Sequence, residues 1–131
     1  MKTELTYLVY VCVLTGLLWV PYVLDRIAKW GLIDAVGYPA NPRPVSPWGS
    51  RLKAAHANAV ENLVVFAPLV LVTNAMGIGN GATAMAAMVY FWARLIHAVA
   101  FALGIPWVRT LAFTAGVVCQ MTFALKILGL V

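Results

Sequence analysis

Charged residues are scarce in this sequence, and acidic residues are the scarcest of all. Only 10% of the 131 residues are charged and 63% are hydrophobic. A soluble domain carries about 25% charged residues. The composition therefore excludes an ordinary soluble domain and indicates a membrane protein. The length suits one compact unit, and we expect residues 1–131 to form a single domain.

Signatures of several enzyme classes and of nucleic-acid binding are also missing. The sequence has no GxSxG motif, no P-loop and no dinucleotide fingerprint. His56 and His97 lie in different apolar segments with no second carboxylate nearby, so we expect no metal site. The net charge of +5 comes from bases that gather around one connection rather than along a stripe, so we expect no nucleic-acid partner. Cys12 and Cys119 lie in apolar surroundings, where a buried free thiol is common.

Long hydrophobic segments, in contrast, make up most of the chain. Four segments of about 19–24 residues can each cross a hydrocarbon core of about 30 Å at about 1.5 Å per residue; they cover residues 6–24, 54–76, 82–103 and 107–130. None alternates as barrel strands do, and backbone in lipid must satisfy its own hydrogen bonds. The sequence therefore predicts an all-α integral membrane protein built as a four-transmembrane-helix bundle. No small-residue cleavage site follows the first segment, so we interpret it as a retained helix.

The connection between the first two predicted helices, residues 25–53, is long and rich in proline. Four prolines within Pro39–Pro47 exclude a helix there. Most bases lie in or beside this connection: Arg26, Lys29, Arg43, Arg51 and Lys53. Arg109 adjoins the third connection, whereas Lys2 and Lys126 lie at the other side. The positive-inside rule therefore predicts cytoplasmic first and third connections, with both termini on the opposite side. We expect a multi-pass protein of a bacterial inner membrane.

A polar cluster interrupts the second apolar segment. Glu61 is the only acid after Asp34, and a carboxylate at membrane depth costs roughly 2.5–3.5 kcal/mol on insertion scales. At helical spacing it falls on one stripe with Arg51, Asn58 and Asn62. The third segment carries its own stripe: Tyr90, Arg94, His97 and Phe101. We expect Arg94 to face protein or water and to pair with Glu61.

This cluster has two interpretations. It either only holds helices together, or it binds an anionic, polar molecule that carries one amine. In the second case Arg94 would pair with a carboxylate, Glu61 would hold the ammonium group, and a guanidinium near a thiol would favour the thiolate. His97 is either a hydrogen-bonded core residue or part of the site. We expect Gln120 to form a hydrogen bond across helices.

Three segments that carry these residues resemble the MAPEG family of integral membrane glutathione transferases and eicosanoid synthases. They are AHANAVEN at residues 55–62 with the later Pro68, YFWARLIH at 90–97, and GIPWVR at 104–109. Chain length and the four-helix pattern agree, so the resemblance covers nearly the whole chain. It implies a homotrimer of four-helix bundles that binds glutathione between neighbouring subunits, near the cytoplasmic side. A hydrophobic second substrate would arrive from the lipid bilayer.

The resemblance also assigns roles to individual residues. Asn58 and Glu61 would hold polar groups of glutathione, and Arg94 would line or brace the site, with His97 on the same stripe. Arg109 would correspond to the basic catalytic residue that stabilises the thiolate. The other candidate glutathione ligands are the bases Arg26, Lys29, Arg51 and Lys53.

The resemblance therefore predicts a glutathione- or thiol-dependent transferase or peroxidase that acts on lipophilic electrophiles, with glutathione as co-substrate. Eicosanoid synthesis is not expected, because His97 and Phe101 stand where those synthases carry tyrosines. The family often has an arginine where this chain has Ala54. This difference motivates a second hypothesis, a non-catalytic trimer whose polar cluster is structural or binds another anion. A third is a small proton-coupled transporter using Glu61, although small multidrug exporters carry their essential acid in the first helix.

Overall fold

Four membrane-spanning units organise the computed structural model, which describes all 131 residues. They are built from six helices: α1 (Thr3–Leu17), α2 (Trp19–Trp30), α3 (Leu32–Val36), α4 (Pro47–Met76), α5 (Gly81–Leu103) and α6 (Pro106–Ile127). The units long and apolar enough to cross a bilayer are α1 with α2, α4, α5 and α6. This result confirms the predicted all-α, four-helix membrane architecture.

The first span is longer than predicted, and it is interrupted once. It runs over 28 residues, from Thr3 to Trp30, with a break at Leu18 between α1 and α2. Pro21 explains the break, because it has no N–H and its ring crowds the carbonyl of Leu17, four residues earlier. At about 1.5 Å per residue, 28 residues cover about 42 Å, more than a hydrocarbon core of about 30 Å. The charged last turns of α2 therefore extend beyond the hydrocarbon core.

The second span begins at Pro47 rather than at residue 54, so part of the predicted connection is helical. Proline suits the first position of a helix, where its missing N–H would be unpaired anyway. Asp25 of α2 accepts hydrogen bonds from the Ser46 backbone N–H (2.9 Å) and from the Ser46 hydroxyl (2.6 Å). The carboxylate of Asp25 also lies at the N-terminus of α4, where the positive end of the helix dipole stabilises negative charge. The exclusion of helix therefore holds up to Ser46 but fails at Pro47.

The start of α5 is fixed by a reciprocal cap, and a buried acid lies beside it. Asn80 Oδ1 accepts from the Thr83 N–H at 3.0 Å, and the Asn80 N–H donates to the Thr83 hydroxyl at 2.8 Å. Glu4 of α1 is buried beside this turn. A Cβ atom placed on Gly79 would lie 3.2 Å from Glu4 Oε2. The helix ends at Gly104, whose φ of 74° is a left-handed conformation that glycine adopts without strain.

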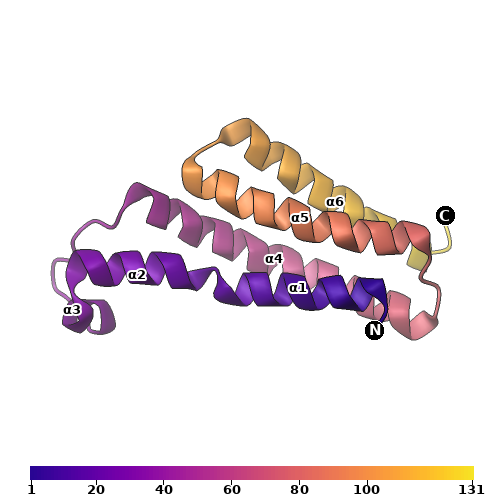
Figure 1. Cartoon of the computed structure of the whole chain (residues 1–131), viewed down its shortest axis with the longest axis horizontal. Coiled ribbons are helices and arrows are strands. Elements are labelled where there is room, and N and C mark those ends of the chain that lie inside the picture. Colours follow the sequence, from indigo (N-terminus) through magenta and orange to yellow (C-terminus); the bar gives the residue numbers. More distant parts are fainter.

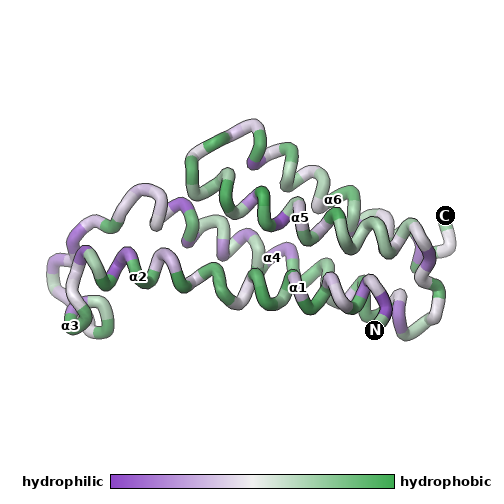
Figure 2. The backbone as a smooth tube through the Cα atoms, viewed as in Figure 1, coloured by the Kyte–Doolittle hydropathy of each residue, from purple (hydrophilic) through white to green (hydrophobic).

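The connections alternate between the two ends of the bundle. Both termini and the α4–α5 connection lie at one end, and the α2–α4 and α5–α6 connections lie at the other (Figure 1). Hydrophilic stretches gather in the α2–α4 connection, and isolated ones lie inside the bundle on α4 and α5 (Figure 2). These isolated positions are the ones that need a structural or functional explanation.

An aromatic stack forms the centre of the core. Phe66 of α4 lies flat on Tyr90 of α5, with ring centroids 3.7 Å apart, and Phe123 of α6 meets Phe66 edge-on at 5.8 Å. Small residues bring α5 and α6 close together: a Cβ atom on Gly116 would touch the Tyr90 ring at 3.5 Å. Membrane helices associate mainly through such close packing. The stack fixes how α4 and α5 are rotated toward each other, one turn away from the polar cluster.

Candidate functional site

The polar residues of α4 and α5 meet through one short hydrogen bond. Arg94 Nη2 donates to Asn58 Oδ1 at 2.7 Å. Arg94 lies about midway along α5 and only 3% of its surface is exposed. A guanidinium at such a depth needs an acceptor, because leaving the charge unpaired in a low-dielectric interior is costly. Asn58 supplies that acceptor.

The predicted ion pair between Glu61 and Arg94 does not form within one chain, so this prediction is wrong for the single subunit. Asn58, not Glu61, holds the Arg94 guanidinium, and the Glu61 side chain is exposed. The physical reason is helix geometry. Three residues advance an α-helix by about 300°, so Glu61 lies about 60° around α4 from Asn58. Asn58 therefore faces α5, while Glu61 points to a side of α4 that the chain leaves open.

The hydrogen-bond network extends from Asn58 to the last helix. Asn62 Nδ2 donates to the Asn58 carbonyl at 2.9 Å and to Asn58 Oδ1 at 3.2 Å. Gln120 Nε2 of α6 approaches the Asn62 carbonyl at 3.3 Å and Asn62 Oδ1 at 3.4 Å. The expected bond of Gln120 across helices is thus confirmed. Polar side chains link α5, α4 and α6 through the apolar interior.

Three buried polar atoms on one face of α5 have no hydrogen-bond partner within the chain. They are the Tyr90 hydroxyl, Arg94 Nε and His97 Nδ1. These residues follow one another at intervals of four and three, so they share a helix face. The His97 ring lies among aromatic side chains, with its centroid 5.6 Å from that of Phe101 and 6.2 Å from that of Phe113. Buried polar groups without partners are uncommon, so this face is a candidate place for a ligand, a water molecule or a neighbouring subunit.

Arg109 lies in the first turn of α6, at the end of the bundle that holds most bases. Its side chain is half-buried, and its guanidinium carbon lies 4.9 Å from the centroid of the Phe101 ring. A cation over an aromatic face is attracted by the ring quadrupole. The Phe101 ring therefore lies near both His97 and Arg109, and it connects the α5 stripe with the candidate catalytic residue Arg109.

The other predicted basic ligands are dispersed. Arg51 Nε donates to the Ala102 carbonyl at 2.9 Å, where a cation stabilises the C-terminal end of α5. The Arg26 guanidinium carbon lies 5.3 Å from the Trp30 ring centroid. Lys29 and Lys53 are exposed. Within one chain the structure thus joins Asn58 to Arg94 and leaves the remaining bases around the same end of the bundle.

Two contacts between α2 and α4 were missed by the sequence argument. One is the Asp25–Ser46 pair, and the other is a hydrogen bond of 2.8 Å between the Tyr22 hydroxyl and His56 Nδ1. A signal for the first was present, because Ser46 before Pro47 is a good start for a helix. No sequence signal tells which helix supplies the partner for His56.

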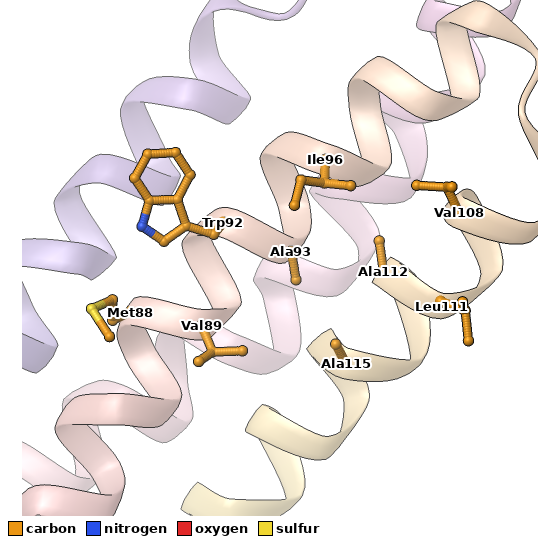
Figure 3. Close-up of a pocket in the computed structure, with 9 residues that line it drawn as sticks. All are labelled: Met88, Val89, Trp92, Ala93, Ile96, Val108, Leu111, Ala112 and Ala115. Atoms are coloured by element: carbon orange, nitrogen blue, oxygen red, sulfur yellow. The ribbon is translucent and has the colours of Figure 1, made fainter.

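An apolar groove runs along the outer side of α5 and α6 (Figure 3). It encloses about 400 Å³, and all nine of its lining residues are hydrophobic. From α5 it takes Met88, Val89, Trp92, Ala93 and Ile96. From α6 it takes Val108, Leu111, Ala112 and Ala115. A groove of this character accommodates hydrocarbon and offers no polar contact.

Comparison with known proteins adds one decisive result. A model of the MAPEG family matches residues 5–129 of the chain. The chain belongs to the MAPEG family. No curated protein and no solved structure matches it significantly.

In this MAPEG protein the second-helix motif has two kinds of position. Ala55 and Ala59 are buried and allow close helix packing. Asn58 is half-buried and bonded to Arg94, while Glu61 is exposed. The motif therefore combines contacts made inside one chain with a polar group directed outward from α4.

Proposed function

We propose that this MAPEG protein is a homotrimeric, glutathione- or thiol-dependent transferase or peroxidase that acts on lipophilic electrophiles. Glutathione would bind between neighbouring subunits, near the end of the bundle formed by the α2–α4 and α5–α6 connections. The orientation with that end in the cytoplasm of a bacterial cell, and both termini outside it, is part of the same proposal.

The observation that carries the proposal is the different placement of Asn58 and Glu61. Asn58 is bonded to the buried Arg94, whereas Glu61, one turn away, is exposed on a membrane-spanning helix without a cation of its own chain. An acid at that depth is costly unless a partner neutralises it. The ammonium group of glutathione, held at a subunit boundary, would neutralise Glu61. Arg94 would brace the site through Asn58, with His97 beside it.

Arg109 would act on the sulfur. Its guanidinium is half-buried near Phe101 and lies in the first turn of α6, where the helix dipole also favours negative charge. Both effects would lower the thiol pKa of glutathione and raise the fraction of thiolate, which is the nucleophile. The thiolate sulfur would bond to the electrophilic carbon as the leaving group departs with its electron pair. Arg51 and Lys53, which lie on α4 like Asn58 and Glu61, would meet the glutathione carboxylates as the subunits assemble.

A direct experiment is glutathione titration of the detergent-purified protein by calorimetry, followed by conjugation and hydroperoxide assays. We expect saturable binding, ultraviolet absorbance from bound thiolate, and turnover with apolar acceptors. Arg109→Ala should lose thiolate absorbance and most turnover, while Lys126→Ala, at the opposite end of the bundle, serves as the matched control. Undiminished turnover in Arg109→Ala removes the role of that residue, and absence of glutathione binding removes the whole proposal.

A second candidate is a non-catalytic trimer whose polar cluster is structural. It is favoured by the network that already joins Arg94, Asn58, Asn62 and Gln120, and by the engagement of Arg51 with the end of α5. In that case glutathione would not bind, and substitutions in the network would change stability alone. The titration above separates the two candidates.

A further inference from the structure

Four strongly exposed apolar side chains near one end of the molecule belong to α3 and the residues that follow it. Ile33 is 87% exposed, Val36 is 76% exposed and Leu32 is 62% exposed, while Tyr38 is fully exposed. These residues form what we call the α3 segment, residues 32–38. Four large apolar side chains in seven residues, all uncovered by their own chain, mark a surface that contacts something else.

The α3 segment is placed beside the bundle, not on top of it. Gly31, whose φ is 80°, ends α2 and reverses the chain direction. In Figure 1, α3 lies next to the end of α2, on the side of α2 opposite to α4. The first span exceeds the hydrocarbon core by about 12 Å, so this end of α2 reaches the layer of lipid headgroups. The α3 segment therefore lies at headgroup depth and faces outward from the bundle.

Basic residues flank the α3 segment on both sides in the sequence. Lys29 and Arg43 are exposed, and Arg26 stacks over Trp30. The Trp30 indole N–H donates to the Arg43 carbonyl at 2.6 Å, and this bond holds the proline-rich connection against the end of α2. Asp25 is buried and bonded to Ser46, so Asp34, on α3 itself, is the only exposed acid nearby. Three bases thus face one accessible acid.

We propose that the α3 segment is an interfacial anchor that binds anionic phospholipids. Its apolar side chains enter the boundary between headgroups and acyl chains, and Arg26, Lys29 and Arg43 bind the lipid phosphates. Short apolar elements beside basic residues bind anionic membrane surfaces by this combination of burial and charge. The proposal does not depend on thiol chemistry, and it holds for either candidate function.

Charge complementarity favours lipid over a second copy of the chain as the occupant. Six of the nine bases lie at this end: Arg26, Lys29, Arg43, Arg51, Lys53 and Arg109. A second copy of the chain seated on the α3 segment itself would place its own bases against Arg26, Lys29 and Arg43 with no bound anion between them, and like charges repel across a contact. An anionic leaflet presents the opposite sign.

The test places a fluorescent reporter on the α3 segment of the full chain. Ile33→Cys, in a Cys12→Ser/Cys119→Ser background, is labelled with an environment-sensitive nitrobenzoxadiazole dye. The protein is reconstituted in phosphatidylcholine vesicles with or without phosphatidylglycerol. We expect blue-shifted emission that is quenched by headgroup-proximal nitroxide lipids, several-fold more strongly with phosphatidylglycerol. Lys29→Gln/Arg43→Gln should abolish the dependence on phosphatidylglycerol, while the same dye at Leu130→Cys, at the opposite end, should not respond to that change.

Two results overturn the proposal. Emission typical of water, quenched by iodide but not by nitroxide lipids in either vesicle, would show that the α3 segment stays in solution. Blue-shifted emission in lipid-free detergent oligomers, insensitive to nitroxide lipids after reconstitution, would show that another copy of the chain covers it. Equal quenching in both kinds of vesicle would remove the part assigned to charge.

Discussion

Arg94 and Asn58 are joined across two membrane helices by a hydrogen bond of 2.7 Å, and this bond leaves Glu61 exposed one turn away. The arrangement divides the polar cluster into an inner part and an outer part. The inner part, the bond between Asn58 and Arg94, is formed within one chain. The outer part, Glu61, requires a cation from elsewhere, which is why the assembled protein with its ligand is the species to test.

The inner part should contribute measurably to stability. Asn58→Ala removes the acceptor of a buried guanidinium, and hydrogen bonds to charged groups are worth about 1.5–3 kcal/mol. We expect the free energy of unfolding in detergent to fall by about that amount. Val60→Ala, at an exposed position on the same helix, is the control and should change it little. A loss no larger than that of the control would contradict the importance of the bond.

Glu61 and Arg94 should behave as independent residues in stability measurements on the unliganded protein. They do not contact each other within the chain, so Glu61→Ala and Arg94→Ala should add to within about 0.5 kcal/mol. Asn58→Ala and Arg94→Ala share a bond and should be clearly non-additive. The readout is a pair of double-mutant cycles from the same unfolding assay. Strong coupling of Glu61 to Arg94 would restore the ion pair that the structure replaces.

The contact between α2 and the start of α4 leaves no room for a methyl group at Gly49. A Cβ atom on Gly49 would lie 2.7 Å from Asp25 Oδ2, closer than real contacts allow. Gly49→Ala should therefore destabilise the protein by about 1–3 kcal/mol, the usual range for overpacking. The loss should shrink when Asp25→Ala is also present. Gly16→Ala is the matched control, since its Cβ would meet no atom within 4 Å and alanine favours a helix.

The aromatic stack should dominate the packing of α4 on α5. Phe66→Ala empties the space between Tyr90 and Phe123. We expect a loss of about 3 kcal/mol, the lower end of the range for such truncations, because lipid tails reduce the apolar driving force. Thermal unfolding checks this, with the exposed Val64→Ala as the control. A loss below about 1 kcal/mol would assign the helix packing to other contacts.

The number of membrane-spanning units could be predicted, because the length of a hydrophobic segment is a local property of the sequence, whereas the short α3 could not. The ends of the helices were harder to predict. The start of α4 at Pro47 depends on Asp25, which accepts a hydrogen bond from Ser46, twenty-one residues later in the sequence, at the N-cap position of the helix. The break at Leu18 follows from a local rule about Pro21, but the continuation of α2 to Trp30 depends on charged turns extending beyond the hydrocarbon core.

The residues of the candidate site could be predicted from the sequence, but which of them bond to one another could not. Helical periodicity places Asn58 and Glu61 near one stripe and Arg94 on another, so their proximity could be expected. The rotation of α4 against α5 decides which of the two acceptors reaches Arg94. That rotation depends on packing between the two helices, above all on the stack of Phe66 on Tyr90 one turn away. Periodicity within a single helix does not contain this information.

Glu4 and Asp25 act on opposite ends of the same span. Glu4 lies against Gly79 at the start of α5, and Asp25 binds Ser46 at the start of α4. Twenty-one residues separate the two acids, about 32 Å along a helix, close to the thickness of the hydrocarbon core. The first span is synthesised before both partners, and sliding it by one turn would break both contacts together. The first span therefore relates the start of α4 at one end of the bundle to the start of α5 at the other.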